Sequence, residues 1–165
     1  MEIDKKDIRA LTKLQLRDFF VAQGDQSFRG NQVYEWLWSK GAHSFEDMTN
    51  ISKATRTMLE ENFVINHIKV DQMQRSEDGT VKNAVRLHDG LVVESVLIPT
   101  NTRTTACVSS QVGCSLDCNF CATARLKRMR NLEPAEIYDQ VIAIDKESRL
   151  YYNHPLSNIV FMGMR

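Results

Sequence analysis

The chain has 165 residues, of which 21 are basic and 21 acidic, so the formal net charge is zero and any sign of a nucleic-acid partner must be local. No apolar run approaches the roughly 20 residues of a membrane helix, and the charged start "MEIDKKDIRALTK" lacks the apolar stretch of a signal peptide. The sequence therefore predicts a cytoplasmic protein whose thiols stay reduced, with no disulfide scaffold and no membrane partner.

Residues 1–62 are predicted to form an N-terminal helical accessory domain. Thr12 can cap a first helix that ends near Gly24, a second helix runs from about Gly30 to Lys40, and a third follows Ser52. The apolar residues expected on these helices are Leu16, Phe19, Phe20 and Val21, then Val33, Trp36 and Leu37, then Met58 and Leu59. Short connections between the helices predict a compact unit.

Residues 63–100 are predicted to form an antiparallel β meander. Residues 66–75, 80–90 and 91–99 have the composition of strands, and the turn signals "SEDG" and "HDG" separate them. The polar stretch "TNTRTT" that follows is interpreted as a linker to a third domain.

Residues 101–165 follow the order strand, loop, helix, strand. The strand "ACVSSQV" leads into the cysteine loop, and "LEPAEIYDQVIAIDKE" is the clearest helix, with Pro134 in its first turn. The apolar run "SNIVFMGM" is typical of a buried strand. One βαβ unit usually brings its two strands together in parallel, so the predicted fold class is an α+β accessory region followed by a first βαβ unit.

All four cysteines lie between residues 107 and 121. Cys114, Cys118 and Cys121 have the spacing C-x3-C-x2-C, and Cys107 stands on the preceding strand, about 20 Å away if that strand is extended. Thiolates hold iron–sulfur clusters or zinc, and three thiolates on a [4Fe–4S] cluster would leave one iron open. A zinc site of three cysteines and a histidine, or buried thiols without metal, are the alternatives that the residues leave open.

The cysteine motif, with Phe120 before its last cysteine, resembles that of the radical S-adenosylmethionine (SAM) superfamily. The wider run "CVSSQVGCSLDCNFCATA", then "RNL", "DQV" and "NIVFMGM", resembles the RlmN-type adenine-C2 RNA methyltransferases. The segments "FRGNQVYEWLW", "FEDMTNISK" and "SEDGTVK" resemble the N-terminal half of the same family. The resemblance implies that residues 101–165 begin a partial (β/α) barrel.

The resemblance implies methylation of carbon 2 of an adenosine in 23S rRNA and in tRNA. Cys114, Cys118 and Cys121 would hold a [4Fe–4S] cluster, and SAM would bind its open iron with Phe120 at the cofactor. A reductant such as flavodoxin would supply the electron, and the enzyme would be a monomer. Polar methyl transfer does not suit an electron-poor ring carbon without an acidic proton, which is why a cofactor carries the chemistry.

Two further residues have roles in the family's reaction. One SAM methylates a cysteine near the C-terminus, and a radical formed on that methyl group adds to the adenine ring. The cysteine that resolves this adduct, by taking the ring proton and closing a transient disulfide, corresponds to Cys107. The family's proton acceptor corresponds to Glu94, within "VESVLIP". A buried apolar thiol and a solvent-facing strand carboxylate are the ordinary readings of these two residues.

The chain departs from the family pattern in three places. The family continues after "MGM" into Gly-Glu-Pro, whereas Met164 here is followed by Arg165, and the methyl-carrying cysteine is missing. Lys127 and Arg128 stand where a Gly-Phe pair is common, within a basic run (Arg125, Lys127, Arg128 and Arg130) that could pair with RNA phosphates or face solvent. We therefore expect a truncated piece that is inactive alone, with an open sheet edge and an exposed apolar face.

Other classes of protein remain possible on the residues alone. One is a non-catalytic RNA-binding module with an inert cysteine segment. Another is a small zinc or iron–sulfur protein. A third is a different radical SAM enzyme such as an activase, although the N-terminal segments favour the RlmN-type family.

Overall fold

The computed structural model describes residues 5–114 and 127–162 and divides the chain into two compact units, Met1–Asn66 and His67–Arg165. The first unit ends at Asn66, whereas the helical domain was predicted to end at residue 62. The second predicted boundary, at residue 100, is absent because one sheet runs through it. Thr100 and Arg103 form a tight turn between two strands, and Thr104 is already buried in the next strand, so "TNTRTT" is not a linker.

The first unit is built from three helices and short connecting elements. Its β1 and β2 form a two-residue parallel pair that the sequence did not predict. In chain order the elements are β1 (Lys6–Asp7), the 3₁₀ turn Ile8–Ala10, α1 (Lys13–Ala22), α2 (Phe28–Trp38), the 3₁₀ turn Phe45–Asp47, α3 (Lys53–Asn62) and β2 (Phe63–Val64).

The predicted helix starts of α1 and α3 are confirmed by their caps. The Thr12 hydroxyl accepts the N–H of Gln15 while the Gln15 side chain accepts the N–H of Thr12. Ser52 likewise accepts the N–H of Thr55. These bonds satisfy donors that a helix N-terminus leaves without partners, so the sequence locates the starts of both helices.

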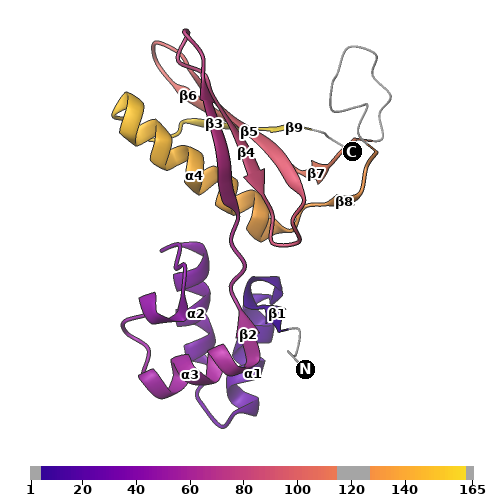
Figure 1. Ribbon diagram of the computed structural model, residues 1–165. Coiled ribbons are helices and arrows are strands. Elements are labelled where there is room, and N and C mark those ends of the chain that lie inside the picture. Colours follow the sequence, from indigo (N-terminus) through magenta and orange to yellow (C-terminus); the bar gives the residue numbers. More distant parts are fainter. Residues whose placement is uncertain (1–4, 115–126, 163–165) are drawn as a thin grey trace. The chain divides into compact units, whose positions relative to one another are not determined.

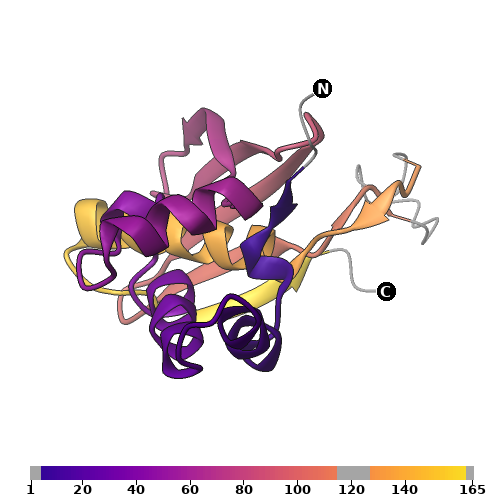
Figure 2. The same ribbon diagram turned by 90° about the horizontal axis from the view of Figure 1, so that it is seen from below.

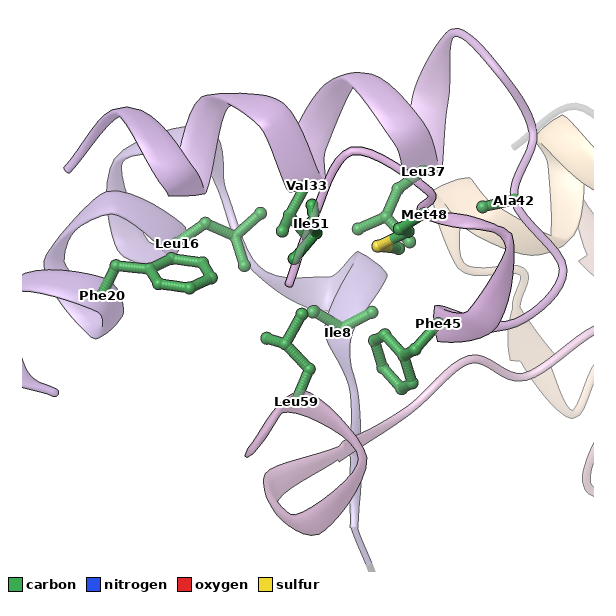
Figure 3. Packing of buried hydrophobic residues seen from close by; sticks show 10 residues of the cluster. All are labelled: Ile8, Leu16, Phe20, Val33, Leu37, Ala42, Phe45, Met48, Ile51 and Leu59. Atoms are coloured by element: carbon green, nitrogen blue, oxygen red, sulfur yellow. The ribbon is translucent and has the colours of Figure 1, made fainter. Parts of the chain in front are cut away.

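A single apolar cluster holds the first unit together. Side chains from the three helices and from both 3₁₀ turns point toward one another (Figure 3). The buried members are Ile8, Leu16, Phe20, Val33, Leu37, Ala42, Phe45, Met48, Ile51 and Leu59. Trp36 and Met58, both predicted to face inward, are partly buried against this cluster.

The second unit contains a five-stranded sheet with one long helix. The strand order is β3-β4-β5-β6-β9, antiparallel through β6, with β6 and β9 parallel. The predicted meander and the predicted parallel βαβ unit are thus both present. The elements are β3 (Lys69–Arg75), β4 (Val81–Arg86), β5 (Val92–Pro99), β6 (Thr104–Ser109), β7 (Gln111–Val112), β8 (Arg130–Asn131), α4 (Pro134–Tyr152) and β9 (Asn158–Met162).

Helix α4 lies along one face of this sheet (Figure 1 and Figure 2). Its Ile144 is fully buried against Val81, Leu97, Ala106 and Val108, which alternate along β4, β5 and β6. Because successive side chains of a strand point to opposite faces, the residues between them lie on the face turned away from α4, which we call the distal face. No helix in the described part of the chain is long and apolar enough to cross a bilayer.

Two predicted strands differ from the observed ones. Residues 106–112 do not form one strand, because the chain leaves the main sheet at Ser110 and continues as β7, which pairs with β8. The composition of β9 predicted a buried strand, but Ile159, Val160 and Phe161 are each 45% exposed, which agrees with the expected open sheet edge and exposed apolar face. Among the described strands β9 lies at the sheet edge with β6 as its one neighbour, so an apolar composition does not guarantee burial there.

Gly30 sets how closely α1 and α2 approach each other. A Cβ atom at this position would lie 2.6 Å from the backbone nitrogen of Arg17 and 2.8 Å from the carbonyl carbon of Leu16. Both neighbours are backbone atoms of α1, so the two helices would have to move apart to make room for a side chain at residue 30.

We predict that Gly30→Ala destabilises the first unit by about 1–3 kcal/mol through overpacking, although alanine is the better helix former. Urea unfolding followed by tryptophan fluorescence measures this directly, because both tryptophans, Trp36 and Trp38, belong to α2. Leu14→Ala on the exposed side of α1 is the control and should change stability by less than about 0.5 kcal/mol. An unchanged midpoint for Gly30→Ala would contradict the close approach.

Candidate active site on the distal face and the cysteine segment

The two residues predicted to act in the reaction, Glu94 and Cys107, lie on the distal face of adjacent strands. Val96 on β5 is the register partner of Cys107 on β6, and Glu94 stands two residues from Val96. Glu94 is therefore a diagonal neighbour of Cys107, an arrangement with Cβ atoms roughly 7 Å apart. The Ser109 hydroxyl, two residues from Cys107, donates to the Glu94 carbonyl oxygen at 2.6 Å.

Glu94 forms an ion pair across the sheet. Its Oε1 lies 3.0 Å from Nζ of Lys82 on β4, and the two side chains are 56% and 48% exposed. Water screens a pair that is this exposed, so its contribution to stability is small. The exposed fraction shows that a molecule on the distal face can reach the Glu94 carboxylate.

Cys107 carries a reduced, half-buried thiol that is in no disulfide. Burial raises the pKa of this thiol above its ordinary value. At neutral pH the group is therefore a thiol rather than a thiolate, and it needs a base before it can act as a nucleophile. Glu94 is a carboxylate that the strand register places near it.

The cysteine segment leaves the sheet beyond Ser109. After β7 the chain turns at Gly113, whose φ of 71° favours glycine, and reaches the buried Cys114. Cys118, Cys121 and Phe120 lie outside the described residues. Within the described ranges no three histidine, cysteine or acidic side chains gather as a metal site.

The returning end of the segment is held by Arg130. Its Nη1 and Nη2 each lie 2.8 Å from one carboxylate oxygen of Glu136 on α4, and its Nε donates to Asp89 at 2.7 Å. Burial opposes ionisation of Glu136, but hydrogen bonds from Arg130 and from the Glu133 N–H outweigh it, so the pKa of this carboxyl lies below its ordinary value. Arg130 is thus already paired with two carboxylates of its own chain, Asp89 and Glu136. The interpretation of its guanidinium as a contact for RNA phosphate is therefore not favoured.

The departing end is held by Gln140, a fully buried residue of α4 that lies within the segment "DQV" but was not among the predicted site residues. Its Oε1 accepts the N–H of Ser109 at 2.9 Å, and its Nε2 donates to the Ser109 carbonyl at 3.1 Å. A signal was available, since Gln140 lies on the same helix face as Ile137 and Ile144. A polar residue on an apolar stripe indicates a buried polar contact.

The comparisons with known proteins agree with the sequence motifs. Residues 6–65 match the model of the ribosomal RNA large subunit methyltransferase N-terminal domain, and this match spans nearly all of the first unit. A protein named probable dual-specificity RNA methyltransferase RlmN, from Flavobacterium johnsoniae, is 88% identical over 164 residues, which are 99% of this chain and 47% of the relative. The chain is thus similar to RlmN-type proteins, and its residues 6–65 to their N-terminal domain.

More distant RlmN-type proteins and a solved structure give the same result. The dual-specificity RNA methyltransferase RlmN of Geotalea uraniireducens is 44% identical over 98% of this chain and 46% of the relative. A crystal structure of a radical SAM methyltransferase from Sphaerobacter thermophilus is 34% identical, with a TM-score of 0.80 over 96% of this chain and 47% of that one. The chain thus spans about half the length of the relatives it matches.

We predict that Glu136→Gln destabilises the second unit by about 2–4 kcal/mol at pH 7, because it leaves the Arg130 guanidinium without its buried partner. The folded-state pKa of Glu136 is depressed, so its contribution is present above the unfolded pKa of about 4.3 and is lost as the pH falls through the folded value. The difference between the two proteins should therefore shrink in acid. Urea unfolding followed by circular dichroism at pH 7 and below pH 4 measures it.

The control for this prediction is Arg149→Gln, which removes the exposed pair with Asp145 on the same helix. A surface pair of this kind should contribute less than about 0.5 kcal/mol. If both variants lose equal stability, or if the effect of Glu136→Gln does not depend on pH, the assignment of Glu136 as the anchor of Arg130 is wrong.

Proposed function

We propose that this chain forms part of an enzyme that methylates carbon 2 of an adenosine in 23S rRNA and in tRNA by radical SAM chemistry. The observation that carries the proposal is the common face of Glu94 and Cys107, followed along the chain by the cysteine segment, in a chain whose relatives are named RNA methyltransferases. Neither residue type is unusual alone. Their placement on the two strands that precede a C-x3-C-x2-C segment supports a reactive pair beside a cofactor site.

The donor set fits an iron–sulfur cluster. Cys114 is buried two residues after the end of β7, and three residues earlier Gln111 has a buried side-chain Nε2 with no partner among the described residues. A buried amide donor without a partner is costly and fits a site that accepts hydrogen bonds, as cluster sulfurs do. Cys114, Cys118 and Cys121 would hold a [4Fe–4S] cluster with SAM at its open iron, which supplies the one-electron cleavage of SAM.

The chain's own residues act on the substrate. Adenine would lie over the distal face, where the half-exposed Glu94 can accept a proton from it or from the Cys107 thiol. Cys107 would take the ring proton and then close a disulfide with the methyl-carrying cysteine of a complementing segment, whose bond from sulfur to the methylene carbon breaks as the S–S bond forms. Lys82 beside Glu94 keeps a positive charge at this face, where an anionic RNA substrate must approach.

We predict that the chain, reconstituted anaerobically with iron and sulfide, binds a [4Fe–4S] cluster whose electron paramagnetic resonance spectrum changes when SAM is added. Cys118→Ala should lose the cluster because two cysteines cannot hold it. Cys107→Ala is the matched control and should keep both the cluster and the SAM response. Zinc in place of iron, or a spectrum that ignores SAM, would refute the cofactor assignment.

Activity of these 165 residues alone is a separate question. The sequence holds no cysteine beyond the four between 107 and 121, so none is left to carry the methyl group. The chain is therefore expected not to methylate RNA without a complementing segment, and a methylation assay with the reconstituted chain tests this. Binding of RNA that is salt-dependent and survives loss of all three cluster cysteines would instead favour the non-catalytic module.

A further inference from the structure

The end of β6 is held by a side chain where a strand would normally pair. The planar amide of Gln140 presents one acceptor and one donor, and both are used on the same residue, the N–H and the carbonyl of Ser109. Its second N–H donates to the Glu136 carbonyl at 3.2 Å. Ser109 still pairs with Met162 of β9, and Gln140 satisfies its N–H and carbonyl beyond the last pair of the β5 ladder.

Ser109 connects this anchor to the reactive pair. Its backbone is held by Gln140 on the helix side, and its hydroxyl donates to the Glu94 carbonyl on β5. The last register pair between the two strands is Val96 with Cys107. Cys107 is also paired with Val160 on β9, so Ser109 holds β6 and β5 together on the Glu94 side of Cys107, where their ladder has ended.

We propose that Gln140 is a positioning residue, which holds Ser109 and thereby keeps Cys107 beside Glu94 in the geometry that adduct resolution requires. The meaning of this role for catalysis rests on the proposed function. The contacts themselves belong to the described chain and involve no cofactor or RNA.

The test measures alkylation of Cys107 by iodoacetamide in the intact reduced chain, with the modified residue located by mass spectrometry. The variant Gln140→Met keeps the side-chain volume but removes the hydrogen bonds to Ser109. The end of β6 then opens more often, and the Cys107 thiol becomes more accessible to the reagent. We expect alkylation of Cys107 to be about tenfold faster, the scale of one lost hydrogen bond. Circular dichroism confirms that the variant is folded.

The matched control is Ser148→Ala. Ser148 is also a fully buried residue of α4, and its hydroxyl bonds the Thr104 hydroxyl at 2.8 Å, at the other end of β6 from Cys107. The Ser148→Ala variant also weakens the contact between α4 and β6, but at the end of β6 that lies away from Cys107 and Glu94. Alkylation of Cys107 should stay within about twofold of the unchanged chain, because local opening is confined to the end that lost its anchor.

A second variant, Gln140→Glu, distinguishes the loss of the specific hydrogen bonds to Ser109 from a general loosening of the second unit. A carboxylate accepts the Ser109 N–H but cannot donate to the Ser109 carbonyl, whereas the protonated acid does both. The alkylation rate of Cys107, divided by that of the unchanged chain at each pH, should therefore fall toward one as the pH decreases. This ratio cancels the titration of the thiol itself.

The ionisable groups near position 140 do not confuse this readout. Glu136, one turn earlier, is paired with Arg130 and has a lowered pKa, so it stays charged until well into acid. Asp139 points to another neighbour, His67, with an oxygen 3.5 Å from its Nδ1. The ratio is also taken in His67→Gln, which removes this neighbour of Asp139.

The proposal is overturned if Gln140→Met and Ser148→Ala change the alkylation of Cys107 equally, or if neither changes it. If Gln140→Met does not fold, the test depends on Gln140→Glu. A relative alkylation rate of Cys107 that does not change with pH in that variant overturns the proposal. Because the assay needs no cluster, SAM or RNA, its failure is distinct from a failure of the proposed function, which the spectroscopic test addresses.

Discussion

The first turns of α4 hold both ends of the cysteine segment, and the rest of the candidate site depends on this constraint. Glu136 binds the Arg130 guanidinium where the segment returns, and Gln140, one turn later on the same helix face, binds the Ser109 backbone where it departs. Each contact is buried, so leaving either partner alone would cost more than the pair contributes. The two ends of the cysteine segment are also joined directly, because β7 and β8 pair as antiparallel strands.

This arrangement separates two tasks along the chain. The face of the sheet that contacts α4 is apolar and fixes the positions of the strands, while the distal face carries Glu94, Lys82 and Cys107 and stays accessible. The register between β5 and β6 decides which residues meet there, and a slip of one residue would turn Cys107 into the core. The reactive residues are thus positioned by strand pairing, supported at the end of β6 by the contact of Gln140 with Ser109, and the ends of the cysteine segment are held by side chains of the same helix.

Much of the fold could be predicted from local sequence signals. The caps at Thr12 and Ser52, the two turns of the meander and the start of α4 at Pro134 each have a short-range cause, and the structure contains all of them. The motif also predicted which cysteines form a set, although Cys118 and Cys121 lie outside the described residues.

What the sequence could not provide depends on partners far apart in the chain. Arg130 looked like part of a basic run, and only the fold brings Asp89 and Glu136 to it. The boundary at residue 100 was misplaced because a polar stretch can form a tight turn as readily as a linker. The burial of β9 was overestimated because composition does not tell a central strand from an edge strand.

Hydrogen exchange of backbone amides in the unmodified chain tests most directly whether α4 fixes both ends of the cysteine segment. The decisive amides are Ser109, bonded to Gln140, and Leu132 and Met129, bonded to the carbonyls of Ser110 and Val112. They should exchange as slowly as amides in the middle of the main sheet. Exchange as fast as that of Thr80, next to an exposed turn, would show that the segment is not held at its ends and would contradict the account.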